Sequence, residues 1–87
     1  MRHAFRIVAA ADPQALPRIV GFFAQRWLVP DCLSSHREGE RLNVELEIDV
    51  EPALADIMAA RLREMVLISD VDRMGSGDRA SLRVRAA

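Results

Sequence analysis

The stretch from Leu42 to Asp49 alternates apolar and polar residues without interruption. The apolar positions are Leu42, Val44, Leu46 and Ile48, and the polar positions between them are Asn43, Glu45, Glu47 and Asp49. Because successive side chains of a strand point to opposite faces, this pattern predicts a strand with one face toward a core. The other face is expected to meet solvent or a partner. Such a strand needs both a sheet and a covering layer, so the rest of the chain must supply them.

Three further stretches have the composition of strands. Residues 2–10 are apolar at both alternating sets of positions, which predicts a central strand that is buried on both faces. Residues 32–37 form a weaker candidate, separated from residue 42 by a turn that contains Gly39. Residues 66–71 supply a last strand. The sheet is therefore expected to contain four strands.

Two stretches have the spacing of amphipathic helices. The first stripe consists of Leu16, Ile19, Val20, Phe23 and Trp27, and the second, after Pro52, consists of Leu54, Ile57, Met58, Leu62 and Met65. Asp12 and Pro13 are suited to the cap and first position of the first helix. In a helix that begins at Pro13, however, Pro17 would remove one backbone hydrogen bond. A start one turn later would leave residues 12–16 as a loop, and the sequence leaves both starts open.

The order strand–helix–strand–strand–helix–strand is that of the ferredoxin-like βαββαβ fold. We therefore predict an α+β domain over residues 1–74, with a four-stranded antiparallel sheet and two helices on one face. Residues 75–87 begin with a Gly-Ser-Gly-Asp run and are predicted to be a flexible C-terminal tail, with an added edge strand as the alternative.

Charge and composition exclude several functions. The chain has 12 basic residues, all arginine, and 13 acidic residues, so its net charge of −1 gives no footprint for nucleic acid or an anionic membrane. No apolar run reaches the roughly 20 residues that span a bilayer. The single cysteine, Cys32, cannot form an intrachain disulfide. We expect a cytoplasmic domain, and because a chain of 87 residues has a marginal core, we expect it to oligomerise.

The residues also argue against catalysis, a metal site or a cofactor held by this chain. His3 and His36 lack the ligand spacing of metal sites. Small acyl-phosphate hydrolases of this topology need a glycine-rich anion-binding loop with an arginine after the first strand, whereas residues 9–14 contain neither. Ser35 and His36 are adjacent on a strand and so point to opposite faces. The remaining candidate is the junction of the first strand and first helix, where free N–H groups could hold the carboxylate of a small acid.

Three stretches resemble the ACT-domain regulatory subunits of acetolactate synthase. Residues 15–26 (ALPRIVGFFAQR) resemble the first helix of that family, and residues 42–48 and 62–71 resemble later parts of it. The short, single-domain form is the most similar, over about residues 3–73. The resemblance implies a homodimer, paired through a sheet edge or a helix. It also implies a large catalytic subunit as partner, which carries thiamine diphosphate and acts in branched-chain amino acid biosynthesis.

The resemblance further implies an effector site, carried over to residues in or near the loop that precedes the first helix. These residues are Ala11, Asp12, Pro13, Gln14, Ala15 and Val29. Ala11 and Val29 stand where valine-sensitive members have asparagine, and Gln14 stands where they have glycine. Losing two amides removes groups that would fix an amino acid, and a side chain at residue 14 obstructs a close backbone approach. We therefore predict weak or absent valine binding.

Other interpretations and surfaces stay open at this stage. Trp27 stands where the family has a glycine; we predict a core residue, with an exposed anchor for the large subunit as the alternative. The acidic residues of the third strand and the pair Arg61 and Arg63 are both possible docking surfaces. The alternative functions are a free-standing ACT domain that senses an amino acid in another pathway and, third, an acylphosphatase-like enzyme.

Overall fold

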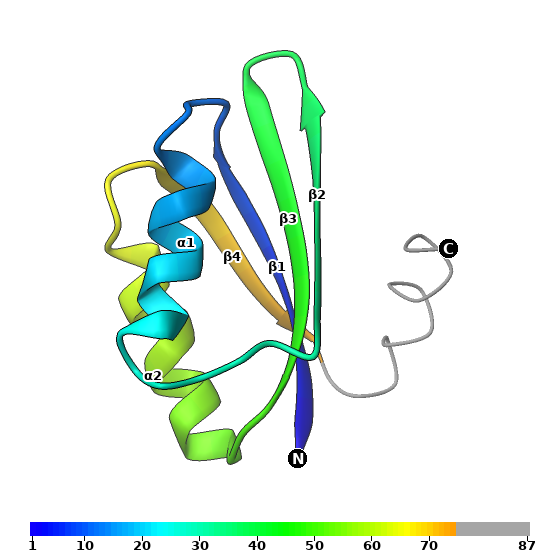
Figure 1. Cartoon of the computed structure of the whole chain (residues 1–87), viewed down its shortest axis with the longest axis vertical. Coiled ribbons are helices and arrows are strands. Elements are labelled where there is room, and N and C mark those ends of the chain that lie inside the picture. The colour runs from blue at the N-terminus through cyan, green and yellow to red at the C-terminus, as the bar shows by residue number, and fades with distance from the viewer. Residues whose placement is uncertain (75–87) are drawn as a thin grey trace.

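The computed structural model describes residues 1–74 and forms an antiparallel sheet with two helices (Figure 1). The elements are β1 (Arg2–Ala10), α1 (Ala15–Ala24), β2 (Cys32–Glu38), β3 (Arg41–Asp49), α2 (Pro52–Arg63) and β4 (Ile68–Met74). The predicted α+β, ferredoxin-like βαββαβ order is confirmed. The last strand begins at Ile68, two residues later than the sequence pattern predicts.

The sheet has the strand order β2-β3-β1-β4, so β1 and β3 are its central strands. β1 pairs antiparallel with β3, where Phe5 lies opposite Leu46, and with β4, where Ile7 lies opposite Val71. β2 joins the other side of β3 through the hairpin whose turn contains Gly39 at φ +61°. The central position predicted for residues 2–10 is thus confirmed, and the chain's first and last described strands are neighbours.

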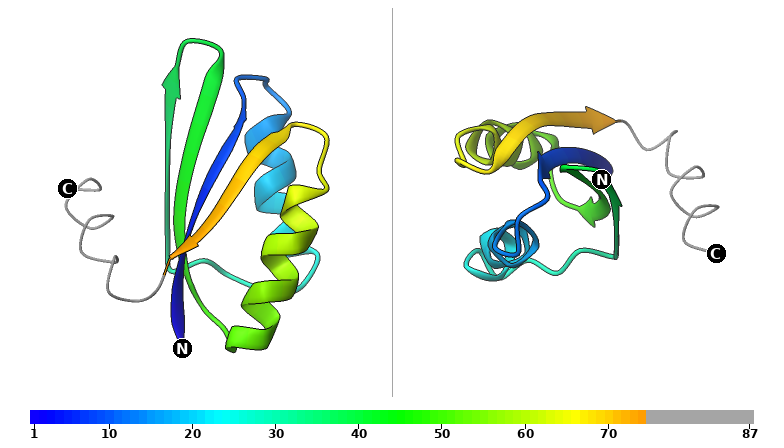
Figure 2. Two further views of the ribbon diagram at one scale, coloured as in Figure 1. Left: turned by 180° about the vertical axis from the view of Figure 1, so that it is seen from behind. Right: turned by 90° about the horizontal axis from the view of Figure 1, so that it is seen from above.

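Both helices cover the same face of the sheet, which is plain in the view from above (Figure 2). The core lies between the layers and includes Phe5 and Ile7 of β1, Leu46 of β3, and Phe23 and Leu62 of the helices, none of which exposes more than 1% of its surface. Burial of such apolar side chains is the main favourable contribution to folding. Neither helix in residues 1–74 is long and apolar enough to cross a membrane.

The first helix starts later than a cap at Asp12 would place it. Its N-cap is Gln14 and its first residue is Ala15. Pro17 is therefore the third residue of α1, where the backbone N–H of any residue would lack a partner within the helix. The proline is thus compatible with a regular helix, and residues 11–14 form the loop that the later start allows.

The helical stripes are only partly as predicted. On α1 the buried residues include Ile19 and Phe23 but also Phe22, whereas Val20 is exposed. On α2 Met58 and Leu62 are buried as expected, but the other buried positions are Ala55 and Ala59 in place of Leu54 and Ile57. An apolar helix offers several overlapping stripes of the same period, and the packing against the sheet selects among them.

Trp27 is not a core residue, and its predicted burial is wrong. Its side chain is 94% exposed, and its backbone has φ +59°, in the left-handed region. The N–H groups of Trp27 and Leu28 donate to the carbonyl oxygens of Ala24 and Phe23, at 3.1 and 3.0 Å. These bonds form the helix-ending turn that usually contains glycine in the left-handed position.

The face of the sheet away from the helices differs from the expected open acidic surface. Asp49 is exposed, but Glu45 and Glu47 are buried. The Nε of Arg6 lies 3.4 Å from Oε2 of Glu45, and Nη1 of Arg2 lies 3.7 Å from Oε1 of Glu47. Arginines of β1 thus lie against two carboxylates of β3, and the predicted exposure of the acidic residues of this strand is wrong for Glu45 and Glu47. The predicted tail at residues 75–87 lies outside the described residues.

Candidate functional site

The loop between β1 and α1 brings together five of the six predicted effector residues, Ala11 to Ala15. Ala11 is held to the hairpin between β2 and β3, because its N–H donates to the carbonyl oxygen of Glu40 at 3.0 Å. Ala15 is buried at the start of α1, while Asp12, Pro13 and Gln14 are exposed. The sixth residue, Val29, follows the other end of α1. A helix of 10 residues is about 15 Å long, so within one chain Val29 does not join this loop.

Asp12 organises the loop by itself. Its Oδ1 accepts the N–H of Gln14 at 2.8 Å, and its carbonyl oxygen accepts the N–H of Ala15 at 2.9 Å. Its own N–H donates to the carbonyl oxygen of Ala10 at 2.8 Å. Aspartate commonly stabilises a turn in this way. The amide groups of Ala11, Asp12, Gln14 and Ala15 are therefore all engaged within the protein, and an incoming carboxylate would also meet the like charge of the Asp12 carboxylate.

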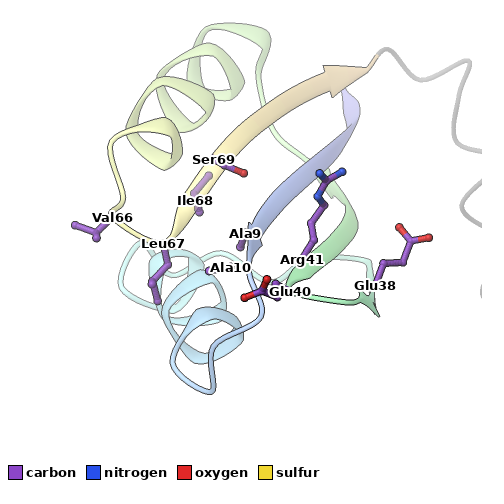
Figure 3. Close-up of a pocket in the computed structure, with 9 residues that line it drawn as sticks. All are labelled: Ala9, Ala10, Glu38, Glu40, Arg41, Val66, Leu67, Ile68 and Ser69. Carbon is purple, nitrogen blue, oxygen red and sulfur yellow. The ribbon is translucent and has the colours of Figure 1, made fainter.

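A pocket of about 530 Å³ lies beside this loop, at the edge where β1 ends and β4 begins. Its lining residues are Ala9, Ala10, Glu38, Glu40, Arg41, Val66, Leu67, Ile68 and Ser69. Figure 3 shows the hairpin residues on one side and the residues that lead into β4 on the other, with Ala9 and Ala10 between them. None of the predicted effector residues lines the pocket, although Ala11 directly follows the lining residue Ala10 in the sequence.

The pocket combines charges of both signs. Arg41 supplies a guanidinium, and Glu38 and Glu40 supply carboxylates. Glu38 also accepts a hydrogen bond from Nδ2 of Asn43 at 3.0 Å. A zwitterion such as a free amino acid carries both charges that these groups would bind. The sequence identified the turn at Gly39 but not this pocket, because only the register that places Ala10 opposite Arg41 brings the hairpin to the end of β1.

Metal-binding and acid–base groups are sparse in the described part of the chain. Within residues 1–74 no three His, Cys, Asp or Glu side chains gather as metal ligands would. His3 lies at the far end of β1 and is 95% buried, with Nε2 lacking a hydrogen-bond partner in the described structure. Burial, followed by the charges of Arg73 and the N-terminal ammonium, lowers the pKa of His3. The histidine is therefore held neutral near pH 7, away from the pocket.

Comparison with known families identifies the fold at the level of a domain family. The family model of the ACT-like domain matches residues 1–79. The chain belongs to the ACT-like domain family. This match covers every helix and strand described above, and it confirms the coarser part of the resemblance drawn from residues 15–26, 42–48 and 62–71.

Solved structures with the same fold belong to different proteins. The ACT domain of a GTP pyrophosphokinase from Chlorobium tepidum has a TM-score of 0.76 and 16% identity, over 87% of this chain and 88% of that one. An acetolactate synthase small subunit from Thermotoga maritima has a TM-score of 0.77 and 9% identity, over 87% of this chain and 48% of that one. The C-terminal domain of the MgtC protein from Mycobacterium tuberculosis has a TM-score of 0.64 and 13% identity, with 84% of each chain covered.

At these sequence identities, the comparison with solved structures shows only that the fold is shared. A search among curated proteins gives no match. Since one fold supports many functions, the function of this ACT-like domain depends on its own residues.

Proposed function

We propose that this ACT-like domain is a non-catalytic regulatory subunit that binds and activates the large subunit of an acetolactate synthase. The observation that carries the proposal is the helix sequence ALPRIVGFFAQR over residues 15–26, which resembles the first helix of those regulatory subunits. The fold of the Thermotoga maritima small subunit, shared over 87% of this chain, supports the same assignment. In this proposal the chain forms a homodimer and the thiamine diphosphate belongs to the large subunit.

The structure of the β1–α1 loop supports the further proposal that valine regulates the complex weakly or not at all. The amides of Ala11, Asp12, Gln14 and Ala15 already have acceptors. A valine carboxylate would have to displace one of these bonds and approach the charged Asp12 side chain. Both changes oppose binding, since an acceptor that loses its donor and a like charge at short range each cost free energy.

Reconstitution tests the proposed activation. The tagged chain is expressed in its source cells, proteins that copurify are identified by mass spectrometry, and the captured large subunit is then purified alone. Acetolactate formation from pyruvate is measured with thiamine diphosphate, with and without the chain. We expect capture of the large subunit and a several-fold rise in its activity. Unchanged activity after addition of the chain would refute the proposal, and calorimetry that finds micromolar valine binding would refute the weak-effector part.

A second candidate function is that of a free-standing amino-acid sensor. It is favoured by the mixed charges of the 530 Å³ pocket, where Arg41 faces a ligand's carboxylate and Glu38 or Glu40 its ammonium. In this case one amino acid of a calorimetric panel binds the isolated chain, and Arg41→Gln abolishes that binding. Binding that persists in Arg41→Gln would place the ligand elsewhere. If the chain instead binds a synthase large subunit without using the pocket, Arg41→Gln leaves capture of that subunit unchanged.

A further inference from the structure

A second hollow of about 490 Å³ lies between the two helices, on the side of the helix layer that faces away from the sheet. We call it the interhelix groove. Residues of α1 and of the turn that follows it line one side, from Pro17 to Arg26. Arg61 near the end of α2, with Glu64 and Met65 after it, lines the other side. No strand contributes to it. The groove is therefore a surface of the helix layer, separate from the pocket beside the β1–α1 loop.

The charges in the interhelix groove are unbalanced. Three arginines line it, Arg18, Arg26 and Arg61, against the single carboxylate of Glu64. The Nη1 of Arg61 lies 3.9 Å from Oε1 of Glu64, which is an exposed and loose pair. Within residues 1–74 no carboxylate forms a salt bridge with Arg18 or Arg26. An overall charge of −1 thus conceals a local excess of positive charge at this groove.

Arg26 is held in place for binding. Its guanidinium carbon lies 3.7 Å from the centroid of the Phe22 ring, and its Nη1 donates to the carbonyl oxygen of Phe22 at 2.9 Å. This stack and hydrogen bond fix the plane of the guanidinium while other N–H groups of the same side chain stay available. A side chain that is already ordered loses less entropy when it binds a carboxylate.

The floor of the groove can admit a partner closely. Gly21 lies in it, and a Cβ at that position would have no heavy atom within 4 Å. Pro17, Phe22 and Met65 add apolar surface. On α2, Ile57 lies four residues before Arg61 and is 56% exposed, so helical spacing continues an apolar stripe from the groove along that helix. The surface is amphipathic, with basic and apolar parts side by side.

We propose that the interhelix groove binds an acidic, amphipathic helix of a partner protein. Arg18 lies on α1, and Arg26 follows the end of that helix, with its guanidinium at the level of Phe22. Phe22 is four residues after Arg18, which corresponds to about 6 Å along the helix. Carboxylates one turn apart on a partner helix have the same spacing, and they supply one charge for each guanidinium. The apolar side of that helix packs over Gly21 and toward Ile57. The inference holds whether or not the partner is a synthase.

This inference also decides between the two arginines of α2 that the sequence left equal. Arg61 lines the interhelix groove, whereas Nη2 of Arg63 donates to the carbonyl oxygen of Val71 on β4 at 2.9 Å. Arg63 therefore joins α2 to the sheet, and Arg61 is the arginine that is available to a partner. The variants Arg61→Gln and Arg63→Gln separate these roles, because the first weakens binding and the second lowers stability.

The experiment uses the full chain and a synthetic, fluorescently labelled helical peptide as the probe. The peptide carries glutamates one turn apart on one face and leucines on the adjacent face, and the control peptide has glutamine at each glutamate. We expect the acidic peptide to bind with an affinity that falls as salt rises, and Arg18→Gln to weaken it by about tenfold. Arg37→Gln, which removes the same charge from the β2–β3 hairpin, is the matched control and should leave binding unchanged.

Arg18 is the decisive position because no hydrogen bond or ion pair of the described structure depends on its side chain, so its variant should fold normally. Arg26→Gln also loses the contact with Phe22, and its binding is interpreted together with its melting temperature. Equal binding of the acidic and glutamine peptides would overturn the proposal, as would no binding of either. Displacement of the acidic peptide by pyrophosphate at similar concentration would also overturn it, because that result describes a site for small anions.

Discussion

The backbone N–H of Leu28 donates to the carbonyl oxygen of Phe23 at 3.0 Å, and the turn that this bond closes holds Trp27 at φ +59°. A residue with a Cβ is strained in this conformation by about 1–2 kcal/mol. The indole does not offset the strain by burial, since 94% of its surface is exposed. A strained and exposed tryptophan is of no use to the stability of the isolated domain.

Trp27→Gly is therefore expected to stabilise the domain. Relief of the left-handed strain exceeds the added flexibility of glycine in the unfolded chain, and we expect a net gain of roughly 0.5–1 kcal/mol. Urea unfolding followed by circular dichroism measures it. Trp27→Ala is the control, because alanine keeps the strain and should change the free energy of unfolding by less than about 0.5 kcal/mol. A loss of about 3 kcal/mol or more in either variant would mean that the side chain is in the core after all.

The glycines Gly21 and Gly39 form a pair that should respond in opposite directions to alanine. Neither has a neighbour within 4 Å of an added Cβ, so only the backbone conformation differs. Gly21 lies inside α1, where alanine should stabilise by about 1 kcal/mol. Gly39 has φ +61°, where alanine should destabilise by about 1 kcal/mol. Thermal melts of the two single variants and the double variant check both signs, and a double variant close to wild type is expected.

The adjacent residues Ile57 and Met58 test which stripe of α2 faces the sheet. Met58 is fully buried, whereas Ile57 is 56% exposed. We expect Met58→Ala to cost about 2–5 kcal/mol of unfolding free energy, as a large-to-small core substitution does. Ile57→Ala should cost about 0.5 kcal/mol or less. Equal losses at the two positions in chemical denaturation would show that the helix is rotated from the orientation described here.

His3 should make stability depend on pH. Burial lowers the pKa of His3 below its ordinary value of 6.5, and the charges of Arg73 and the N-terminal ammonium lower it further, while Asp56 and a backbone hydrogen bond with Val50 oppose them. Since the unfolded chain binds the proton more tightly, the contribution of His3 is fully present above about pH 6.5. It is lost as the pH falls through the lower native pKa. Urea unfolding between about pH 8 and about pH 5 measures this decline.

His3→Gln should flatten that part of the pH profile, because the variant lacks the buried imidazole whose pKa differs between the folded and unfolded chain. His36 provides the matched control. It is exposed on β2 and shares the sheet with His3, so His36→Gln should leave the decline in place. If the profile flattened only in His36→Gln, the decline in stability would come from His36, and the prediction for His3 would be wrong.

The strands were predictable because a two-residue period has few alternatives. The two apolar faces of residues 2–10 predict a central strand, and the alternation of residues 42–49 predicts the face that this strand turns to the core. A one-residue shift of either strand would reverse every side chain, so the pattern fixes the face of each strand. That β3 is also central and pairs with β1 is a finding of the structure. The buried faces of the helices are less determined by the sequence, because on α2 a stripe that includes Ala59 is as apolar as one that includes Ile57.

The candidate site was less predictable than the fold. The loop at residues 11–15 was found from its position after a strand, but the engagement of its amides depends on Asp12 and on the distant Glu40. The interhelix groove joins Arg18 and Arg61 from two helices with Arg26 from the turn after α1, and no local pattern connects them. The contact of Glu47 with Arg2 is of the same kind, since it joins two strands. Long-range pairing decided each of these features.

The position of β1 between β3 and β4 has a consequence for synthesis of the chain. β1 is made first, yet one of its neighbours, β4, does not begin until Ile68. The hydroxyl of Ser69 bonds the carbonyl oxygen of Val8 across 61 residues of sequence. A strand that is apolar on both faces must therefore wait on the ribosome until nearly the whole domain has emerged, because such long-range pairing cannot be completed earlier. The domain therefore closes only when β4 has emerged, and β1 is the segment that most needs protection meanwhile.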